Sequence, residues 1–422
     1  MCGIVGYIGE RALWPVLLEG LRRLEYRGYD SAGVVYFKNS KIEVAKVKGR
    51  VYHLEELLFT KDRTGVGGPG LGHTRWATHG EPSDINAHPH IDCTGKLALV
   101  HNGIIENYYE LKERLLKKGH KFVSATDTEV VVHLIEDFWK EGFPIKEAFS
   151  LALKELKGAY ALALISSIEP DKIYVARYQS PLVIGIGEGE NFIASDIPAL
   201  LPFTKKIVYL KERECAVISA KDIKLFDFDG REREVEIVTI NWDISQAEKS
   251  GFPHFMLKEI FEQPQALQNT LLGRINLDRK EIDFSKEDLP LNWFEKELKK
   301  IYLVACGTSY HSCLVGKYLV DKYLKIPIEV DLASEFRYRE PYLDEKTLFI
   351  CLSQSGETAD TLASLRLAKE YKAKTLSICN VLGSSITQES EKVLYTQAGP
   401  EISVASTKAF TTQVLMFILL SA

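Results

Sequence analysis

The chain has 422 residues, a formal net charge of −5, 45% hydrophobic residues and 26% charged residues. These values are ordinary for a globular protein and give no reason to expect a nucleic-acid partner or an anionic membrane surface. The length predicts two or three domains, and the apolar run Val414–Leu420 is too short to cross a bilayer.

The first half of the chain reads as a mixture of strands and helices. Extended segments are expected at residues 4–8, 31–36, 97–100 and 159–164, and helical periodicity is present at 14–24, 108–118 and 128–139. A last strand-like segment, Val235–Val238, precedes a polar stretch at 239–250. We therefore expect a layered α+β domain over residues 2–240.

The second half changes character. Residues 255–273 read as a helix interrupted at Pro264, within a linker and helical segment at 241–289. Short apolar runs at 301–305, 348–352 and 375–379 are strands, and the first two are followed by a polar turn and a helix. This alternation predicts a parallel α/β domain over residues 290–422.

The start of the chain, MCGIVG, places a cysteine directly after the initiator methionine. We expect Met1 to be removed, which leaves a thiol and a free α-amine on Cys2. An α-amine titrates near neutral pH, so it can act as the base for a thiol nucleophile. The alternative is that Cys2 is an ordinary small apolar residue of a buried first strand.

Three further motifs carry groups suited to an amino-acid ligand. Arg75, in the segment 72–80, can bind a carboxylate through two parallel hydrogen bonds. Asn102 and Gly103 follow an apolar strand, so an amide NH₂ and a backbone N–H can converge on one oxygen, although Asn-Gly is also a common turn. Asp127 either binds a cation or caps the helix that follows it.

Cysteine and histidine usage gives no reason to expect a metal or another cofactor. The seven cysteines are odd in number and scattered without a CxxC pair, which favours a reducing cytoplasm over a disulfide scaffold. Five of the ten histidines lie within residues 73–101, but their spacing does not match a known ligand pattern. We expect polar and substrate-binding roles for them.

Five blocks of the first half resemble a known family. MCGIVGYIG, EYRGYDSAG (25–33), HTRWATHG (73–80), HNGIIEN (101–107) and TDTE (126–129) are similar to the glutaminase domain of the class II amidotransferases, in the version that aminates a phosphosugar. This resemblance implies an αββα N-terminal-nucleophile fold. It implies that Cys2 is the nucleophile, with its own α-amine as base, and that Asn102 and Gly103 form the oxyanion hole. The implied glutamine pocket consists of Arg75 for the carboxylate, Asp127 for the ammonium group, Thr78 and His79 as lining, and Trp76 as a gate for ammonia.

The second half has hydroxyl-rich turns at three predicted helix starts, within 306–309, 353–358 and 403–408. A serine before a helix is commonly only a cap, but three such turns at one sheet edge favour an anion-binding crevice. The nucleotide-binding GxxxxGK[ST] pattern is absent. ACGTSYHS (305–312), SQSGETADT (353–361) and VASTKAF (404–410) resemble the sugar isomerase (SIS) family, whose fold is flavodoxin-like. The resemblance implies phosphate binding by Ser353, Gln354, Ser355 and Thr358, and sugar contacts by Thr308, Ser309, Val404 and Ser406.

Together the two resemblances imply an enzyme that transfers the amide nitrogen of L-glutamine to fructose 6-phosphate and forms glucosamine 6-phosphate. The family carries a second SIS domain, which we do not find before Ala422, so we expect sugar isomerisation to be incomplete in this chain and a homodimer at full length. Two alternatives stay open: a class II amidotransferase with another acceptor, and a phosphosugar-binding regulatory protein with residual glutaminase activity.

Overall fold

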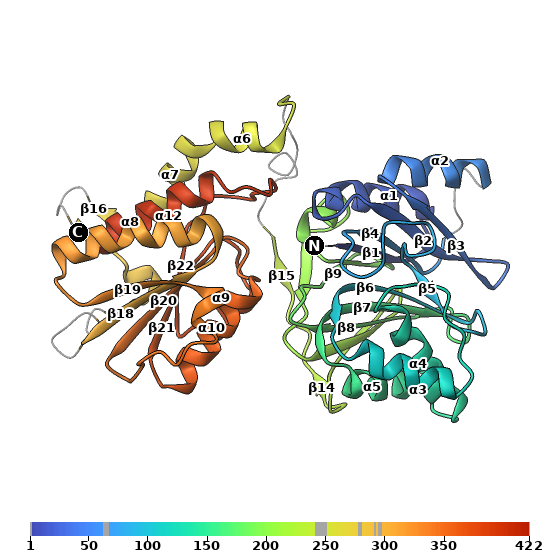
Figure 1. The fold of residues 1–422 in the computed structure, drawn as a ribbon. Coiled ribbons are helices and arrows are strands. Elements are labelled where there is room, and N and C mark those ends of the chain that lie inside the picture. Colours follow the sequence, from blue (N-terminus) through green and yellow to red (C-terminus); the bar gives the residue numbers. More distant parts are fainter. Residues whose placement is uncertain are drawn as a thin grey trace. The chain divides into compact units, whose positions relative to one another are not determined.

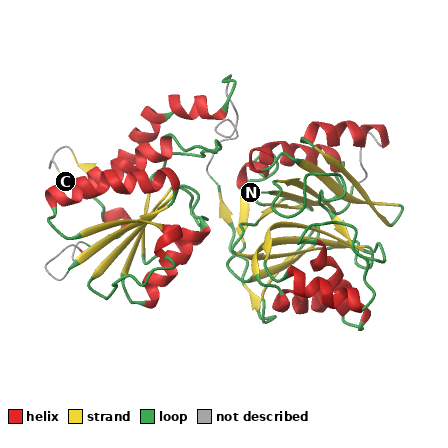
Figure 2. Cartoon of the chain, viewed as in Figure 1, coloured by secondary structure: helices red, strands yellow, loops and turns green. Residues whose placement is uncertain are grey.

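The computed structural model describes residues 2–61, 67–240, 251–276, 281–290, 293 and 298–421. The chain divides into two compact units, Met1–Ile244 and Ser245–Ala422, and each is described by itself (Figures 1 and 2). Among these residues no helix combines the length and the apolar character that crossing a membrane requires. The polar stretch predicted as the domain boundary lies mostly at 241–250, outside the described residues.

The first unit is a sandwich of two antiparallel sheets. One sheet has the strand order β15-β11-β9-β10-β1-β4-β2-β3 and the other β14-β13-β12-β8-β7-β6-β5. The first sheet contains β1 (Gly3–Ile8), β2 (Ser31–Lys38), β3 (Lys41–Lys48), β4 (Gly70–Arg75), β9 (Val183–Ile186), β10 (Asn191–Ala194), β11 (Lys206–Tyr209) and β15 (Val238–Thr239). The second contains β5 (His90–Ile91), β6 (Leu97–Ile105), β7 (Gly158–Ser166), β8 (Ile173–Tyr178), β12 (Glu214–Ile218), β13 (Ile223–Asp227) and β14 (Glu232–Arg233).

Helices cover the outer face of each sheet, which gives four layers (Figure 1). The helices α1 (Leu13–Leu24) and α2 (Val51–Lys61) lie on the first sheet, and α3 (Tyr108–Lys117), α4 (Glu129–Lys140) and α5 (Ile145–Glu155) belong to the second. Short 3₁₀ turns occupy Glu25–Arg27 (η1) and Ile197–Ala199 (η2). Strands of both sheets contribute to one buried apolar core, for example Ile4 and Ala163.

The second unit is built on a parallel sheet with the strand order β19-β18-β20-β21-β22. Numbered along the chain this is the order 2-1-3-4-5, that of the flavodoxin fold, and the chain changes direction between β18 and β20. The strands are β18 (Lys300–Ala305), β19 (Ile328–Leu332), β20 (Thr347–Ser353), β21 (Lys374–Cys379) and β22 (Lys392–Tyr395).

Helices cover both faces of this parallel sheet. Residues of α8 and α12 join the core on one face, and residues of α9 and α10 join the core on the other. The helices of this unit are α6 (Phe255–Phe261), α7 (Gln263–Leu271), α8 (Gly307–Tyr323), α9 (Ala333–Phe336), α10 (Ala359–Glu370), α11 (Ser385–Glu389) and α12 (Lys408–Ser421). Shorter elements are the hairpin of β16 (Ile275–Asn276) and β17 (Glu281–Ile282) and the 3₁₀ turn η4 (Ser285–Glu287).

The predicted fold class, a layered αββα domain followed by a parallel α/β domain, is confirmed. One local prediction is wrong: no strand covers Val235–Val238, because pairing starts only at Val238, which is opposite Ile207 of β11. Pro264 does interrupt the helix of 255–273, but it stands in the first turn of α7, where its missing N–H costs no hydrogen bond.

Candidate functional site

Cys2 precedes β1, and its thiol is half-buried in the first unit. The Trp76 N–H donates to Cys2 Sγ at 3.3 Å, which fixes the thiol against the end of β4. Burial raises the pKa of the Cys2 thiol, and the nearby positive charge of Arg75 acts in the opposite direction. The thiol is therefore protonated at neutral pH and needs a base to react. Met1 lies outside the described residues.

The backbone carbonyl of Cys2 is held by two side chains. Asn102 Nδ2 donates to it at 3.1 Å, and so does Arg27 Nε at 3.1 Å. The other end of the Asn102 amide, Oδ1, lies 3.1 Å from His73 Nε2, which is also 2.9 Å from the carbonyl oxygen of His101. Since His73 Nε2 faces two oxygen atoms, it must carry a hydrogen, and the Asn102 NH₂ group is thereby turned toward residue 2.

Asn102 and Gly103 lie inside strand β6, so the interpretation of Asn-Gly as a turn is wrong. Gly103 has φ +126°, and a Cβ atom there would stand 1.9 Å from the carbonyl oxygen of Ala159 on the neighbouring strand. Only glycine fits this position. An oxyanion hole formed by Asn102 and Gly103 stays a prediction.

Arg75 ends β4 and is buried. Its Nη2 atom donates to the carbonyl oxygens of His79 and Gly80, the latter at 2.8 Å. Its Nη1 atom is buried and, among the described residues, has no hydrogen-bond partner. A buried cationic nitrogen without a partner is costly, so the geometry suits an anionic ligand that would complete it.

Asp127 is buried, and its Oδ2 atom accepts a hydrogen bond of 2.7 Å from the backbone N–H of Ile105 at the end of β6. The helix α4 begins two residues later, with Thr128 at the N-cap position and no side-chain cap. The alternative that Asp127 caps this helix is therefore wrong. The contact instead places a carboxylate beside the strand that carries Asn102.

The remaining predicted pocket residues belong to the loop after β4. Trp76 is 47% exposed, and its ring meets Tyr29 edge to face. His79 packs edge to face on Tyr108, and Thr78 is exposed. The N–H of Ala77 in this loop donates to the carboxylate of Asp30. The backbone N–H groups of Trp76 and Ala77 thus both hold the start of this loop. Gating by Trp76 and binding by Thr78 and His79 stay predictions.

Four of the five histidines within residues 73–101, all except His79, form a buried cluster next to this site. His73 stacks on His88, which also contacts the rings of His90 and His101. Burial lowers the pKa of all four rings, that of His73 to about 3. Some of their nitrogens bond to the protein itself, as in the contact of His101 Nδ1 with Thr128 Oγ1 at 2.8 Å. His73 Nδ1 and His101 Nε2 are buried and have no hydrogen-bond partner among the described residues.

In the second unit, the loop 353–358 leaves β20 and enters α10. Ser353 Oγ accepts from the N–H of Gly356 at 2.9 Å and lies 3.2 Å from Thr358 Oγ1. Thr358 occupies the N-cap position of α10 without capping it by its side chain. The Glu357 carboxylate binds the N–H and hydroxyl of Ser385 at 2.9 and 2.8 Å, which anchors the loop. The hydroxyls therefore line a pre-shaped turn at a helix N-terminus.

Thr308 and Ser309 open α8, directly after β18. Because β18 and β20 are parallel neighbours, this turn and the loop 353–358 lie at the same sheet edge, at the point where the strand order reverses. Ser309 is buried and its hydroxyl accepts from Gln413 Nε2 at 3.0 Å. Val404 is 92% exposed and Ser406 is half-buried, on the loop before α12.

Comparisons with known proteins find relatives of both units. The family model described as "Glutamine amidotransferase domain" matches residues 73–202, and the one described as "SIS domain" matches residues 296–421. The glutamine–fructose-6-phosphate aminotransferase [isomerizing] of Clostridium tetani is 52% identical, over 99% of this chain and 68% of the relative. The protein of the same name from Thermococcus kodakarensis is 51% identical, over 100% of this chain and 68% of the relative.

The chain belongs to the glutamine–fructose-6-phosphate aminotransferase family. A solved structure, the C-terminal domain of glucosamine-fructose-6-phosphate aminotransferase from Francisella tularensis, is 45% identical and covers 41% of this chain and 48% of that one, with a TM-score of 0.39.

Sequence reasoning missed several groups that position the residues of the candidate glutaminase site. Arg27 binds the Cys2 carbonyl and pairs with Asp196 at 3.0 Å, and the Tyr26 hydroxyl donates to the same carboxylate at 2.5 Å. Asp30 holds the loop after β4. Tyr26, Arg27 and Asp30 lie in the block EYRGYDSAG, whose match to the family was the available signal. No motif in the sequence pointed to Asp196.

Proposed function

We propose that this chain hydrolyses L-glutamine at Cys2 and binds fructose 6-phosphate as the acceptor of the ammonia, in a family reaction whose products are L-glutamate and glucosamine 6-phosphate. The observation that carries the glutamine half is the buried Arg75 guanidinium, whose Nη1 atom lacks a partner among the described residues. Its neighbour in the chain, Trp76, donates its backbone N–H to Cys2 Sγ. The names of the relatives support fructose 6-phosphate as the acceptor.

The chemistry follows from the groups around Cys2. Once Met1 is removed, the α-amine of residue 2 takes the thiol proton, and the thiolate attacks the side-chain amide carbon of glutamine. The oxygen that becomes negative is stabilised by donors aimed at it, for which Asn102 Nδ2 and the Gly103 N–H are our candidates. The proton passes to the leaving nitrogen, so ammonia departs and a thioester remains. Water then cleaves the thioester and restores the thiol.

The two charged groups of glutamine would each be bound by a side chain of opposite charge. Arg75 would bind the α-carboxylate of glutamine through its free Nη1 atom, and the Asp127 carboxylate would bind the α-ammonium group. Trp76, Thr78 and His79 would close the pocket around them. Because both charged side chains are buried, water competes weakly for them, and an uncharged amide without an α-carboxylate should bind poorly.

In the second unit, the phosphate of the sugar would bind the hydroxyls and the amide of Ser353, Gln354, Ser355 and Thr358. These neutral groups lie at the N-terminal end of α10, whose partial positive charge favours an anion. Thr308, Ser309, Val404 and Ser406 would contact the sugar. We expect isothermal titration to give a dissociation constant for fructose 6-phosphate that rises about tenfold or more in Ser353→Ala, the usual loss of a charge-assisted hydrogen bond, with Ser334→Ala unchanged.

We further propose a reducing, cytoplasmic compartment, and a homodimer when the protein has the full length of its relatives. All seven cysteines are free, and the proposed reaction needs Cys2 reduced. Sedimentation of the protein at the full length of its relatives tests the dimer.

The deciding experiment is covalent labelling by a glutamine-mimicking diazo-ketone, followed by mapping of the adduct. We expect modification of Cys2 on a chain that has lost Met1, with glutamine protecting against it. An adduct at Cys93 or Cys306, or activity in a chain that retains Met1, would contradict the proposal. Binding of fructose 6-phosphate without any reactive Cys2 would favour a phosphosugar-binding regulatory protein instead.

A further inference from the structure

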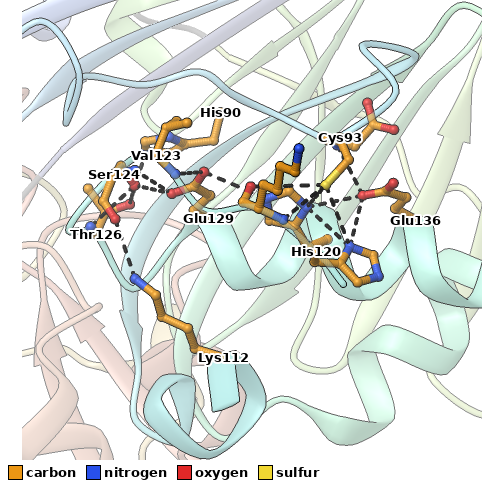
Figure 3. A network of polar contacts seen from close by, with 12 residues as sticks. His90, Cys93, Lys112, His120, Val123, Ser124, Thr126, Glu129 and Glu136 are labelled. Carbon is orange, nitrogen blue, oxygen red and sulfur yellow. Dashed lines mark hydrogen bonds and ion pairs between the residues drawn. The ribbon is translucent and has the colours of Figure 1, made fainter. Parts of the chain in front are cut away.

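A second group of reactive side chains lies in the first unit, and the proposed reaction does not use it. Cys93, His120, His133 and Glu136 each offer one ligand atom, and these four atoms lie within 4.8 Å of one another. Figure 3 shows Cys93, His120 and Glu136 turned toward a common point. Their spacing in the sequence, with 26 and then 12 residues between the first three ligands, matches no compact metal motif.

We propose that Cys93, His120, His133 and Glu136 bind one zinc ion. This inference is independent of the proposed function. The donor set of one thiolate, two imidazoles and one carboxylate is one that zinc prefers, and four protein ligands make a closed, structural site rather than a catalytic one. The charges of the thiolate and the carboxylate together balance those of Zn²⁺.

The five distances between ligand atoms, from 3.0 to 3.9 Å, are near those of a tetrahedron around zinc. Zinc–nitrogen and zinc–oxygen bonds of about 2.0 Å and zinc–sulfur bonds of about 2.3 Å require edges of roughly 3.3–3.6 Å. The two Nδ1 atoms of His120 and His133 are 3.4 Å apart, and Cys93 Sγ is 3.9 and 3.6 Å from them. Glu136 Oε2 is 3.1 and 3.0 Å from the same two nitrogens.

The surroundings favour a cation over a set of hydrogen bonds alone. Two Nδ1 atoms and a thiol face one another, and if each carried a hydrogen these hydrogens would crowd the space before Glu136 Oε2. A zinc ion replaces these hydrogens with one centre of charge +2. On the far side of each ring a carboxylate lies 3.6 Å from Nε2, Asp137 for His120 and Glu129 for His133. Carboxylates behind the ligating imidazoles are typical of zinc sites.

The chain also holds each ligand in place before any ion arrives. His133 and Glu136 are three residues apart on α4, so they share one face of the helix. Cys93 stands in a turn in which Asp92 Oδ1 accepts from the N–H groups of Lys96 and Leu97 at 2.8 and 2.9 Å. The Lys121 N–H donates to Cys93 Sγ at 3.3 Å, which favours a thiolate there.

Burial fits a structural ion that enters from the surface. His120, His133 and Glu136 are buried, whereas Cys93 is exposed. The four ligands come from the turn after β5, the loop after α3 and the helix α4. An ion here would therefore connect three segments that are distant in the sequence. One of them, the loop between α3 and α4, contains both His120 and Asp127. We expect removal of zinc by a chelator to lower the melting temperature of the chain.

The test uses metal analysis and cobalt spectroscopy on the whole chain. We expect about one zinc per chain after purification without chelator, and a Co²⁺-substituted protein whose spectrum contains a thiolate-to-metal charge-transfer band and the visible bands of tetrahedral Co²⁺. Cys93→Ala and His133→Gln should bind zinc at least about 100-fold more weakly. Cys2→Ala, the matched loss of a thiol, and His311→Gln, the matched loss of an exposed imidazole, should keep the wild-type affinity.

Several outcomes would overturn the zinc site. One is unchanged zinc content in Cys93→Ala, and another is zinc lost from Cys2→Ala, which would place the ion on the other thiol. Absence of stoichiometric zinc binding by the wild type would leave a hydrogen-bonded cluster only. Since the cobalt spectrum is recorded on the unmodified sequence, the proposal stays testable even where a variant fails to fold.

Discussion

His73 Nε2 lies 3.1 Å from Asn102 Oδ1, and this contact joins strand β4 to strand β6. It lies beside Cys2, which we propose to be the first residue of the chain after removal of Met1. The pKa of His73, lowered to about 3 by burial, keeps the ring neutral at physiological pH. A neutral ring has one N–H group, and here this group is on Nε2 and faces both the carbonyl oxygen of His101 and Oδ1 of Asn102. The orientation of Asn102 is therefore set before a substrate binds.

Replacing Asn102 with Ala should lower kcat for glutamine hydrolysis by roughly 10²–10³, the usual effect of removing one oxyanion donor. KM should change little, because the donor acts on charge that develops only in the transition state. Steady-state glutamate release measures both constants, and Asn269→Ala in the second unit serves as the control. A raised KM with an intact kcat would identify Asn102 as a ground-state contact.

Gly103→Ala should destabilise the first unit by more than about 3 kcal/mol, because the new Cβ would meet the Ala159 carbonyl at 1.9 Å and no side chain can move aside. Gly142→Ala is the matched control: its φ is also positive, +102°, but no atom lies within 4 Å of the new Cβ. It should cost only the strain of the conformation, about 1–2 kcal/mol. Urea unfolding of the two variants checks the difference, and equal losses would contradict the close contact.

Arg75→Lys should raise KM for glutamine about 10- to 100-fold, the loss expected for hydrogen bonds to a charged group. Lysine keeps the positive charge but lacks the planar fork of Arg75, which bonds to the His79 and Gly80 carbonyls and leaves Nη1 without a partner among the described residues. Arg22→Lys, at a more exposed position, should leave KM unchanged. Circular dichroism confirms that both variants are folded, and an unaltered KM in folded Arg75→Lys would remove Arg75 from the glutamine pocket.

Acid should destabilise the first unit through His73. Its pKa is about 3 in the folded chain and 6.5 in the reference state, so the unfolded chain takes up the proton first. The stability that the neutral ring contributes is present above pH 6.5 and is lost as the pH falls toward 3. Between pH 7 and pH 5 this ring alone should cost about 2 kcal/mol.

His73→Gln isolates that contribution, because glutamine does not titrate. The groups that face His73 are the rings of His88 and His101 and the guanidinium of Arg75, and they stay in the variant. Urea unfolding at pH 7 and pH 5 should give a smaller loss of stability in His73→Gln than in the wild type. The same loss in both proteins would mean that His73 does not titrate in this range.

The sequence predicted well those elements whose pattern is local. The apolar runs at 301–305 and 348–352 became β18 and β20, since a strand buried on both faces needs apolar residues at every position. Val235–Val238 alternates in the same way as a strand, yet only Val238 and Thr239 pair with β11, although β11 continues to Tyr209. Strand pairing depends on residues far away in the chain, and no local pattern contains it.

The candidate site residues also differ in whether a local sequence pattern or only the folded structure points to them. Cys2, Arg75 and Asn102 lie in contiguous motifs, so the residues next to them in the sequence were enough to make each a candidate site residue. Asp127 was ambiguous, because a carboxylate before a helix is a common cap, and its bond to the Ile105 N–H exists only in the folded unit. The group Cys93, His120, His133 and Glu136 was not predicted at all, since a β turn, a loop and a helix bring it together.

The loop that carries Val404 and Ser406 is held from outside the parallel sheet. Glu259 of α6 binds the N–H groups of Ile402 and Ser403 at 2.6 and 3.1 Å, and Lys408 pairs with Glu262 at 2.7 Å. A recombinant fragment that starts at residue 296, where the family model begins, would lose both anchors while keeping every residue of the proposed sugar site. Anyone who isolates this half for crystallisation or ligand screening should begin upstream of Phe255.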